Sequence, residues 1–398
     1  MAKVITDAKK IESVLSRGVE EIIVKKHLKD AILSGKKLRV KLGIDPTSPN
    51  IHLGRAVVLR KLRAFQELGH EVVFIVGDFT GQIGDTSDKD SERPMLSEQE
   101  VKKNLKTYFE QAFKIVDKSK TETHYNSEWL SKLNFLEIGE IANLFGWHEF
   151  EARENVARRL KLGKRVSLRE VLYPLMQGYD SVAVRADLEL GGTDQKFNML
   201  AARTIQPHYK QNPQDIMITK LMMGTDGRKM SSSWGNVINI TDSAEDMFGK
   251  TMSVPDSFVR EYFILATDLD EDEIDMYERE LSPRDVKAEL AFEIVKLYHG
   301  DPAAGAARES FKKIFSEKET PENAPEIKIG KDEISILDLV ILSGAVKSKS
   351  EARRLIEQGG VDLDGMAKSD PAEIFKSKGG EVLKIGKKNF FRLRRFAQ

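Results

Sequence analysis

Residues 38–77 read as strand, loop, helix and strand, and this pattern constrains the fold more than any other feature of the 398-residue chain. Alternating apolar residues predict a strand over 38–44. Apolar residues at helical spacing follow as far as Gly69, and the apolar run 72–76 is typical of a strand buried in a parallel sheet. A β-α-β unit has a right-handed crossover and binds ligands beyond the carboxyl ends of its strands. The sequence therefore predicts an open α/β sheet with a site in the first loop.

That first loop leads from turn-forming residues 45–50 into His52 and Gly54 at the start of the helix. A helix N-terminus attracts phosphate through its unpaired N–H groups and its partial positive charge. His52 could donate there to an oxygen that gains charge during a reaction, and Gly54 leaves room for a ligand beside the backbone. Taken alone, His52 would be an ordinary surface histidine, but the DPT and PxxHLG sequences around it favour a ligand site.

The composition, 40% apolar and 32% charged, is typical of a soluble globular protein of two or three domains. The absence of cysteine excludes disulfides and thiolate zinc sites. No apolar signal core and no run of membrane-spanning length occur, which predicts a cytoplasmic protein without membrane contact. Because the net charge is zero, any contact with nucleic acid must come from a local basic patch.

The Gly- and Asp-rich segment 77–89 follows the second strand. Its glycines fit neither the GxGxxG dinucleotide fingerprint nor the P-loop, so a dehydrogenase and a P-loop NTPase are disfavoured. Asp85 in this segment could bind a substrate ammonium, with a plain solvated loop as the alternative.

A capping box at 167–170 predicts a helix on which Tyr173, Gln177 and Asp180 share one face. A hydroxyl, an amide and a carboxylate among apolar neighbours suit a pocket for a polar aromatic ligand. Asp180 could accept a hydrogen bond from a phenol, while Tyr173 and Gln177 could bind an ammonium group. Such a site rejects an analogue that lacks the hydroxyl. The alternative is a polar helix face in water.

Two later segments add candidate ligand groups. Gly191 and Gly192 precede Asp194 in a strand-to-helix turn, where Asp194 is either a helix N-cap or a ribose ligand; the glycine pair favours the ligand. Lys229 begins a Lys-Met-Ser sequence in a Gly/Ser-rich loop after the last strand, where a mobile lysine could neutralise pyrophosphate. The position of this loop after the other site elements favours that interpretation over a solvated basic loop.

The rest of the chain indicates further domains. An amphipathic stripe over 3–34 predicts a helix without chemistry. The predicted organisation is a nucleotide-binding domain over 1–235 with a helical insertion at about 97–165, an α-helical domain over 236–316, a linker over 317–333 and a small α+β RNA-binding domain over 334–398.

The last domain carries the expected basic patch. Residues 376–398 hold eight Lys and Arg residues and one Glu, a local charge of +7, with phenylalanines interleaved. Basic residues among aromatics suit RNA, whereas the alternative is a solubilising tail. The candidates for RNA contact are Lys349, Arg353, Arg354, Lys387 and Lys388.

Over nearly its whole length the chain resembles the bacterial tyrosyl-tRNA synthetases, which are class I aminoacyl-tRNA synthetases. The matching segments are Gly43–Thr47, His52–Gly54, Ile83–Asp85, Tyr173 with Gln177 and Asp180, Gly191–Gln195, and Lys229–Ser231. The last domain is similar to a small RNA-binding domain that these enzymes share with a ribosomal protein and with pseudouridine synthases.

The resemblance implies a homodimer with a Rossmann-like catalytic domain. It implies that the tyrosine carboxylate attacks the α-phosphate of ATP, that pyrophosphate leaves, and that tyrosine passes from the adenylate to the terminal adenosine of tRNA(Tyr). Magnesium would accompany ATP without a metal site held by the protein.

The resemblance also implies the role of each site residue. The catalytic residues would be His52, Arg55 and Lys229. The ATP site would comprise Gly43, Asp45, Thr47, His52, Gly54, Gly191, Gly192, Asp194, Lys229, Met230 and Ser231. The tyrosine site would comprise Lys41, Asp85, Tyr173, Gln177, Asp180 and Gln195.

Three positions depart from the family pattern. Arg55 replaces the second histidine of the first signature, and a cation at a helix N-terminus is unfavourable without an anion, so we expect Arg55 to contact ATP phosphate. Ser232 stands in a lysine loop that lacks its second lysine. Lys41 stands where many relatives carry a pocket tyrosine, although a subgroup of relatives has lysine there.

Two alternatives remain. A tryptophanyl-tRNA synthetase would keep the fold, but the basic last domain and Asp180 disfavour it. A catalytically impaired paralogue that acts as an RNA-binding protein would explain Arg55 and Ser232. The complete Tyr173, Gln177 and Asp180 face argues against it, since such a protein has no use for a phenol pocket.

Overall fold

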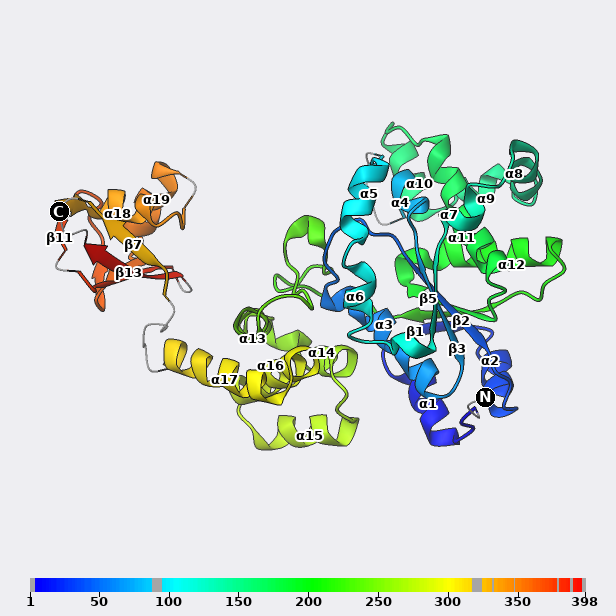
Figure 1. Ribbon diagram of the computed structural model, residues 1–398, viewed down its shortest axis with the longest axis horizontal. Helices are drawn as coiled ribbons and strands as arrows, with labels where there is room; N and C mark the ends of the chain where they lie inside the picture. Colours follow the sequence, from blue (N-terminus) through cyan, green and yellow to red (C-terminus); the bar gives the residue numbers. More distant parts are fainter. Residues whose placement is uncertain are drawn as a thin grey trace. The chain divides into compact units, whose positions relative to one another are not determined.

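The computed structural model describes residues 4–87, 95–316, 324–330, 333–346, 348–377, 379–386 and 389–395. The chain divides at about residue 305 into two compact units, which are described separately (Figure 1). Within the described residues, no helix is long and apolar enough to cross a membrane.

The first unit is built on a six-stranded sheet of order β1-β6-β5-β2-β3-β4. The strands are β1 Val19–Ile23, β2 Arg39–Ile44, β3 Glu71–Val76, β4 Thr121–Tyr125, β5 Leu188–Gly192 and β6 Asp215–Thr219. All pairings are parallel except that of β1 with β6. The predicted β-α-β unit is confirmed as β2, α3 (Leu53–Glu67) and β3, and the predicted open α/β sheet is present.

The order of the strands creates a crevice. From β2 the chain proceeds through β3 to β4 on one side, whereas β5 pairs with the other side of β2 and leads to β6. The connections that leave β2 and β5 therefore run in opposite directions, and the carboxyl ends of these two strands flank a gap where ligands bind in such sheets.

Apolar burial holds the sheet and α3 together. The side chains of β3 from Val72 to Val76 are buried, as the continuous apolar run predicts. Leu59, Leu62 and Phe65, three and four residues apart on α3, are also fully buried. Their shared face makes α3 a fixed support for the loop that precedes it.

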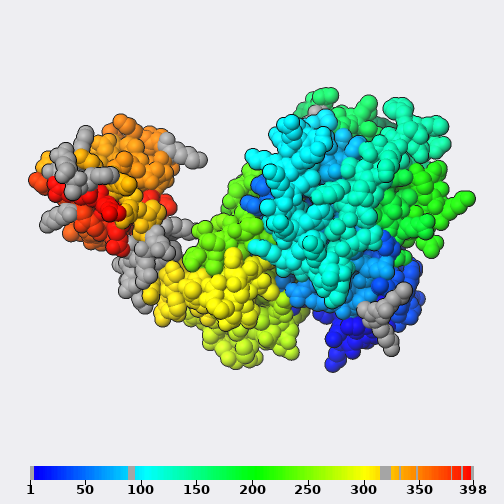
Figure 2. Space-filling model, in the orientation of Figure 1, coloured from blue at the N-terminus to red at the C-terminus, as the bar shows by residue number. Residues whose placement is uncertain are grey.

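Helices fill the connections from β3 to β5. They are α4 Thr80–Ile83, α5 Glu98–Leu105, α6 Tyr108–Ala112, η1 Lys118–Lys120, α7 Ser127–Leu130, α8 Phe135–Ala142, α9 Trp147–Glu151, α10 Glu154–Lys161 and α11 Leu168–Ala183. The predicted insertion at 97–165 is helical but is interrupted by β4, which belongs to the main sheet. Figure 2 shows this segment, coloured cyan to green, over much of one face of the unit.

The helix predicted over 3–34 is wrong in its extent. The described part forms α1 (Ala8–Ser16), β1 and α2 (Lys25–Leu33). Gly18 and Val24 take positive φ angles of 64° and 63°, which end the helical path on either side of β1. β6 offers an unpaired edge, with which residues 19–23 pair as strand β1. This pairing outweighs the helical periodicity of the local sequence.

Further helices follow the sheet. They are η2 Thr193–Gln195 and α12 Lys196–His208, then η3 Ser232–Trp234, α13 Ala244–Met252, η4 Asp256–Phe258, α14 Val259–Ala266, α15 Glu271–Glu280, α16 Pro283–His299 and α17 Asp301–Ser316. The helical character predicted for 236–316 is thus present. Arg17 donates to the carbonyls of Ile264 and Leu269 at the end of α14, which joins the helices to the sheet part.

The second unit is a small α+β domain. The division at about residue 305 falls within α17, and the elements after this helix are β7 Glu326–Ile329, β8 Glu333–Ser335, α18 Ile336–Leu342, α19 Lys349–Glu357, β9 Val361–Leu363, β10 Met366–Lys368, β11 Ile374–Lys376, β12 Val382–Ile385 and β13 Asn389–Arg395. Asp364 and Gly365, both at positive φ, form the turn that connects β9 to β10 in an antiparallel hairpin. Within the predicted linker 317–333, residues 326–329 instead form β7, which pairs in parallel with β13. Residues 317–323 and 331–332 lie outside the described residues.

The close packing of α11 on α12 predicts a stability difference between two glycines. A Cβ on Gly178 of α11 would lie 2.6 Å from Ile205 Cδ1 and 3.1 Å from the backbone nitrogen of Ala202. A Cβ on Gly139 of α8 would meet nothing within 4 Å. We expect Gly178→Ala to destabilise the protein by about 1–2 kcal/mol after its gain in helix propensity, and Gly139→Ala to stabilise it by about 0.5–1 kcal/mol.

Equilibrium urea unfolding followed by far-UV circular dichroism measures both variants. Equal shifts of the two midpoints would contradict the tight α11–α12 contact.

Candidate active site

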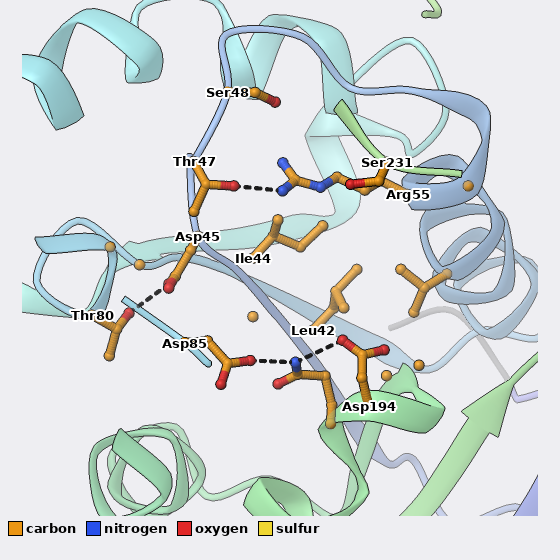
Figure 3. A pocket seen from close by; sticks show the side chains of 18 of the residues that line it. Leu42, Ile44, Asp45, Thr47, Ser48, Arg55, Thr80, Asp85, Asp194 and Ser231 are labelled. Atoms are coloured by element: carbon orange, nitrogen blue, oxygen red, sulfur yellow. Dashed lines mark hydrogen bonds between the residues drawn. The ribbon is translucent and has the colours of Figure 1, made fainter. Parts of the chain in front are cut away.

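A cavity of about 570 Å³ lies at the carboxyl ends of β2, β3 and β5, where the sheet topology places a ligand (Figure 3). The predicted catalytic, ATP and tyrosine residues that line it are Gly43, Asp45, Thr47, His52, Gly54, Arg55, Asp85, Tyr173, Gln177, Asp180, Gly191, Gly192, Asp194, Gln195, Lys229, Met230 and Ser231. Segments more than 180 residues apart in the sequence therefore meet in one pocket, and of the predicted small-molecule residues Lys41 is outside it.

His52 is the N-cap residue of α3. Its Nδ1 accepts a hydrogen bond of 3.3 Å from the backbone N–H of Arg55, so the neutral ring carries its proton on Nε2. Burial, with the charges of Arg55 and Lys229 nearby, lowers the pKa of His52 to about 3. The ring is therefore neutral at physiological pH and can offer one N–H donor to an oxygen.

Gly54 lies where a side chain would crowd its neighbours. A Cβ on Gly54 would be 3.1 Å from His52 Nδ1 and 3.4 Å from Met230 Cβ. Its own N–H points to the sulfur of Met230 at 3.2 Å. The two predicted signatures, around His52 and around Lys229, are thus in direct contact.

Arg55 bridges the first loop and α6. Its guanidinium donates to Thr47 Oγ1 at 2.7 Å (Figure 3). It also donates to Tyr108 Oη at 2.7 Å. Both partners are neutral hydroxyls, so these bonds orient the side chain without neutralising its charge. A cation held in this way beside the N-terminus of α3 suits an anionic ligand.

Asp45 is held by two hydroxyl donors. Thr80 Oγ1 donates to Oδ1 at 2.7 Å (Figure 3). Tyr173 Oη donates to Oδ2 at 2.8 Å. Burial raises the pKa of Asp45 to about 6 in spite of these donors. A Cβ on Gly77 would lie 2.1 Å from Asp45 Oδ1, so the backbone there must be glycine. Tyr173 is consequently fixed in orientation from α11 to β2.

Asp180 lines the cavity and is buried. Trp129 Nε1 donates to its Oδ1 at 2.7 Å and Asn126 Nδ2 donates to its Oδ2 at 3.2 Å. Burial raises the pKa of Asp180 to about 7, while Lys41 and the two donors oppose the shift. Asn126 and Trp129 were not identified as site residues from the sequence. Their position directly after β4, at the carboxyl edge of the sheet, is the signal that could have found them.

The opposite wall combines Asp85, Gln195 and Asp194. Gln195 Nε2 donates to Asp85 Oδ2 at 2.6 Å and to Asp194 Oδ2 at 3.2 Å (Figure 3). Ser87 donates its backbone N–H and its hydroxyl to Asp85 Oδ1. Lys229 Nζ lies 3.6 Å from Asp194 Oδ1. Two carboxylates and one lysine therefore face the same side of the cavity from three separate loops.

The prediction that Lys41 lines the ligand pocket is wrong. Its side chain is fully buried, and Nζ donates to Glu189 Oε1 at 2.8 Å, to Ser181 Oγ at 3.0 Å and to the carbonyl of Gln177 at 3.1 Å. The ammonium is directed to α11 and β5 behind the cavity because a buried charge needs a partner. Glu189 was missed in the sequence, where a lone carboxylate within an apolar strand was the available signal.

The candidates for RNA contact fall in the second unit. Lys349, Arg353 and Arg354 are exposed on α19, whose opposite face buries Ala352 and Ile356. Lys387 and Lys388 lie outside the described residues. In the part of the chain that the structure describes, no group of three His, Cys, Asp or Glu side chains could hold a metal ion.

Comparison with known proteins agrees with this site. Residues 33–316 match the family described as class I tRNA synthetases (W and Y), and residues 317–393 match the C-terminal domain described as tyrosine–tRNA ligase SYY-like. The chain is 47% identical over 386 residues to the tyrosine–tRNA ligase of Thermotoga maritima and 44% identical over 381 residues to that of Aquifex aeolicus. Each alignment covers 96% of this chain, with 96% and 97% of the respective relatives.

Solved structures share the fold. A C-terminally truncated mitochondrial tyrosyl-tRNA synthetase of Aspergillus nidulans matches with a TM-score of 0.65 at 22% identity, over 77% of this chain and 94% of that one. The tyrosyl-tRNA synthetase of Archaeoglobus fulgidus, solved with L-tyrosine, matches with a TM-score of 0.60 at 21% identity, over 75% of this chain and 99% of that one.

The environment of Asp180 predicts an optical titration. Below about pH 7 the carboxyl holds its proton, and above it the carboxylate accepts from the Trp129 indole, so tryptophan emission should change with a midpoint near pH 7. His124 is a second titrating neighbour of Trp129, with ring centroids 5.4 Å apart and a raised pKa. We expect the transition to survive in His124→Gln and to vanish in Asp180→Asn. A transition that persists in Asp180→Asn would contradict the raised pKa.

Proposed function

We propose a role for each pocket residue from one premise: this chain belongs to the class I tRNA synthetases of the tryptophan and tyrosine group and is a tyrosine–tRNA ligase. It activates L-tyrosine with ATP to tyrosyl-adenylate and pyrophosphate, then transfers tyrosine to the 3′-terminal adenosine of tRNA(Tyr). The observation that supports the residue roles is that the predicted amino-acid and nucleotide residues line one cavity.

Tyrosine binds along α11 in this proposal. The phenol donates to Asp180, whose carboxylate is already oriented by Trp129. The ammonium group meets Tyr173, Gln177 and Asp85. Phenylalanine would leave Asp180 buried without its ligand donor, which is a strong basis for discrimination.

ATP occupies the glycine-lined side of the cavity. Gly43, Gly191 and Gly192 let the nucleotide approach the backbone, and Asp194 binds the ribose. The Nε2–H of His52 donates to the α-phosphate, where negative charge develops as the tyrosine carboxylate attacks. This neutral donor needs no proton transfer to act.

Lys229, with Met230 and Ser231, closes on the pyrophosphate leaving group. Lys229 Nζ, which lies 3.6 Å from Asp194 Oδ1, would leave this carboxylate and pair with phosphate as the loop moves. Magnesium bound with ATP would supply further neutralisation of the phosphates, whose oxygens this cation prefers.

The second unit binds tRNA(Tyr) through α19. Lys349, Arg353 and Arg354 form a short basic face that can contact phosphates, and such contacts weaken as salt rises. We place this reaction in the cytoplasm, where tRNA charging takes place.

The chain acts as a homodimer in this proposal. Segment 135–168 exposes large apolar side chains: Phe135 at 91%, Leu136 at 73%, Leu162 at 63%, Leu168 at 75% and Trp147 at 52%. Exposed apolar surface of this kind favours association, and an identical copy supplies a self-complementary partner.

The test of the activity is ATP–pyrophosphate exchange with each of the twenty amino acids. Exchange with tyrosine alone is expected, and it should be lost in Asp180→Ala because the phenol then has no acceptor. Exchange with tryptophan would support the tryptophanyl alternative. The absence of exchange with any amino acid would support the impaired RNA-binding paralogue.

Arg55 provides a second prediction. Replacing it with alanine removes charge-assisted bonds to ATP phosphate, so the KM for ATP should rise about 10- to 100-fold while the KM for tyrosine is unchanged. Arg63→Ala, on the same helix but paired with Glu67, is the matched control and should leave both constants unchanged. An unchanged KM for ATP in Arg55→Ala would refute the phosphate contact.

The dimer surface gives a third prediction. Phe135→Asp combined with Leu136→Asp should shift the protein from dimer to monomer in analytical ultracentrifugation, because two charges would be buried in an apolar contact. Met276→Asp on α15 alters an apolar residue outside segment 135–168 and should leave the dimer intact. If the double variant sediments as wild type, this surface is not the interface.

A further inference from the structure

Lys41 and Glu189 form an ion pair behind the cavity, in register across the parallel β2–β5 pairing. Their side chains are 0% and 1% exposed. Lys41 Nζ and Gln177 Nε2 both donate to Glu189 Oε1, at 2.8 and 3.0 Å. Ser181 Oγ and Gln214 Nε2 donate to Oε2, at 3.2 and 2.5 Å. Every described bond to this carboxylate is therefore a donated one, as its ionised form requires.

Stability does not explain such a pair. A buried ion pair costs desolvation that its attraction often fails to exceed, and an apolar pair of similar volume is usually as stable. The neighbouring positions on β2 and β5, Leu42 and Leu188, are apolar and buried. The reason for the charge pair is accordingly to be found in its effect on neighbouring residues.

The neighbour that also lines the cavity is Gln177. A glutamine amide can present either its N–H₂ donors or its oxygen acceptor in a given direction, but a carboxylate only accepts. Glu189 therefore forces Nε2 of Gln177 inward and leaves Oε1 as the free end. Lys41 bonds to the carbonyl of the same residue at 3.1 Å, which fixes its backbone as well.

An ammonium group has only donors to offer, so a receptor must present acceptors. We propose that Lys41 and Glu189 are positioning residues that hold the Gln177 amide with its oxygen toward the α-ammonium group of tyrosine. This inference rests on the proposed role of Gln177 in the tyrosine site. It accounts for a lysine that the cavity does not contact and for a carboxylate in the middle of an apolar strand.

The experiment uses the full chain with Lys41→Met and Glu189→Gln combined, since neither charge is then left unpaired. In this variant residue 189 can donate as well as accept, and the orientation of Gln177 is no longer imposed. The probes are L-tyrosine and 3-(4-hydroxyphenyl)propionate, which lacks the amino group. We expect the Kd for tyrosine to rise about tenfold or more, the Kd for the deaminated probe to change less than about twofold, and kcat in exchange to stay near wild type.

Two controls separate the outcomes. Ser181→Ala touches the same ion pair without touching the Gln177 side chain, so its ratio of the two Kd values should match wild type. Gln177→Met should reproduce the selective loss of tyrosine affinity. If Gln177→Met is selective and the double variant is not, the positioning role is overturned while the proposed function stands. If Gln177→Met itself weakens both probes equally, the proposed contact of Gln177 with the ammonium group is wrong, and the inference fails with it.

A measurement on the wild-type protein guards against a variant that does not fold. Because Gln177 Nε2 faces a buried carboxylate, its side-chain amide protons should stay protected from exchange in NMR both before and after tyrosine binds. Rapid exchange in either state would overturn the fixed orientation.

Discussion

The parallel pairing of β2 with β5 is the constraint on which the site depends. The two strands are separated by almost 150 residues, yet Lys41 and Glu189 face one another across them. This register sets which residues of the two following loops meet, because a slip would move every side chain to the other face. His52 and Asp45 come from the loop after β2, and Asp194 and Gln195 come from the turn after β5. The helices that cover the strands then complete a cavity in which the loops after β2 and β5 are already aligned.

Burial of polar groups makes this cavity selective for its ligand, and it costs the free energy of removing those groups from water. Asp45 and Asp180 both have raised pKa values because they are desolvated, and each is surrounded by donors that hold it in one orientation. A buried acceptor of this kind favours a ligand that supplies a matching donor and penalises one that does not. Desolvation shifts the pKa of His52 in the opposite direction: burial lowers this pKa and keeps the imidazole ring neutral. The pocket therefore works through groups that are oriented before the substrate arrives.

Much of the fold and the site could be predicted from local patterns. The β2-α3-β3 unit, the polar face of α11 and the glycine pair at 191–192 each follow from spacing within a few residues. The elements that were missed depend on distant partners. β1 forms because an edge of β6 is open, and β7 forms because β13 offers it a partner far along the chain. Asn126 and Trp129 gain their importance only because Asp180 lies beside them.

The sequence by itself determined the class of sheet, the loops that carry the site and the family. Periodicity and glycine spacing are local properties, and the ordered motifs are legible without coordinates. Only the tertiary structure decided the role of Lys41, which turns away from the cavity to meet Glu189, and the orientation of the amide of Gln177. A side chain's partners depend on packing between segments far apart in the chain, and a buried charge is directed by the nearest opposite charge and not by its neighbours in sequence.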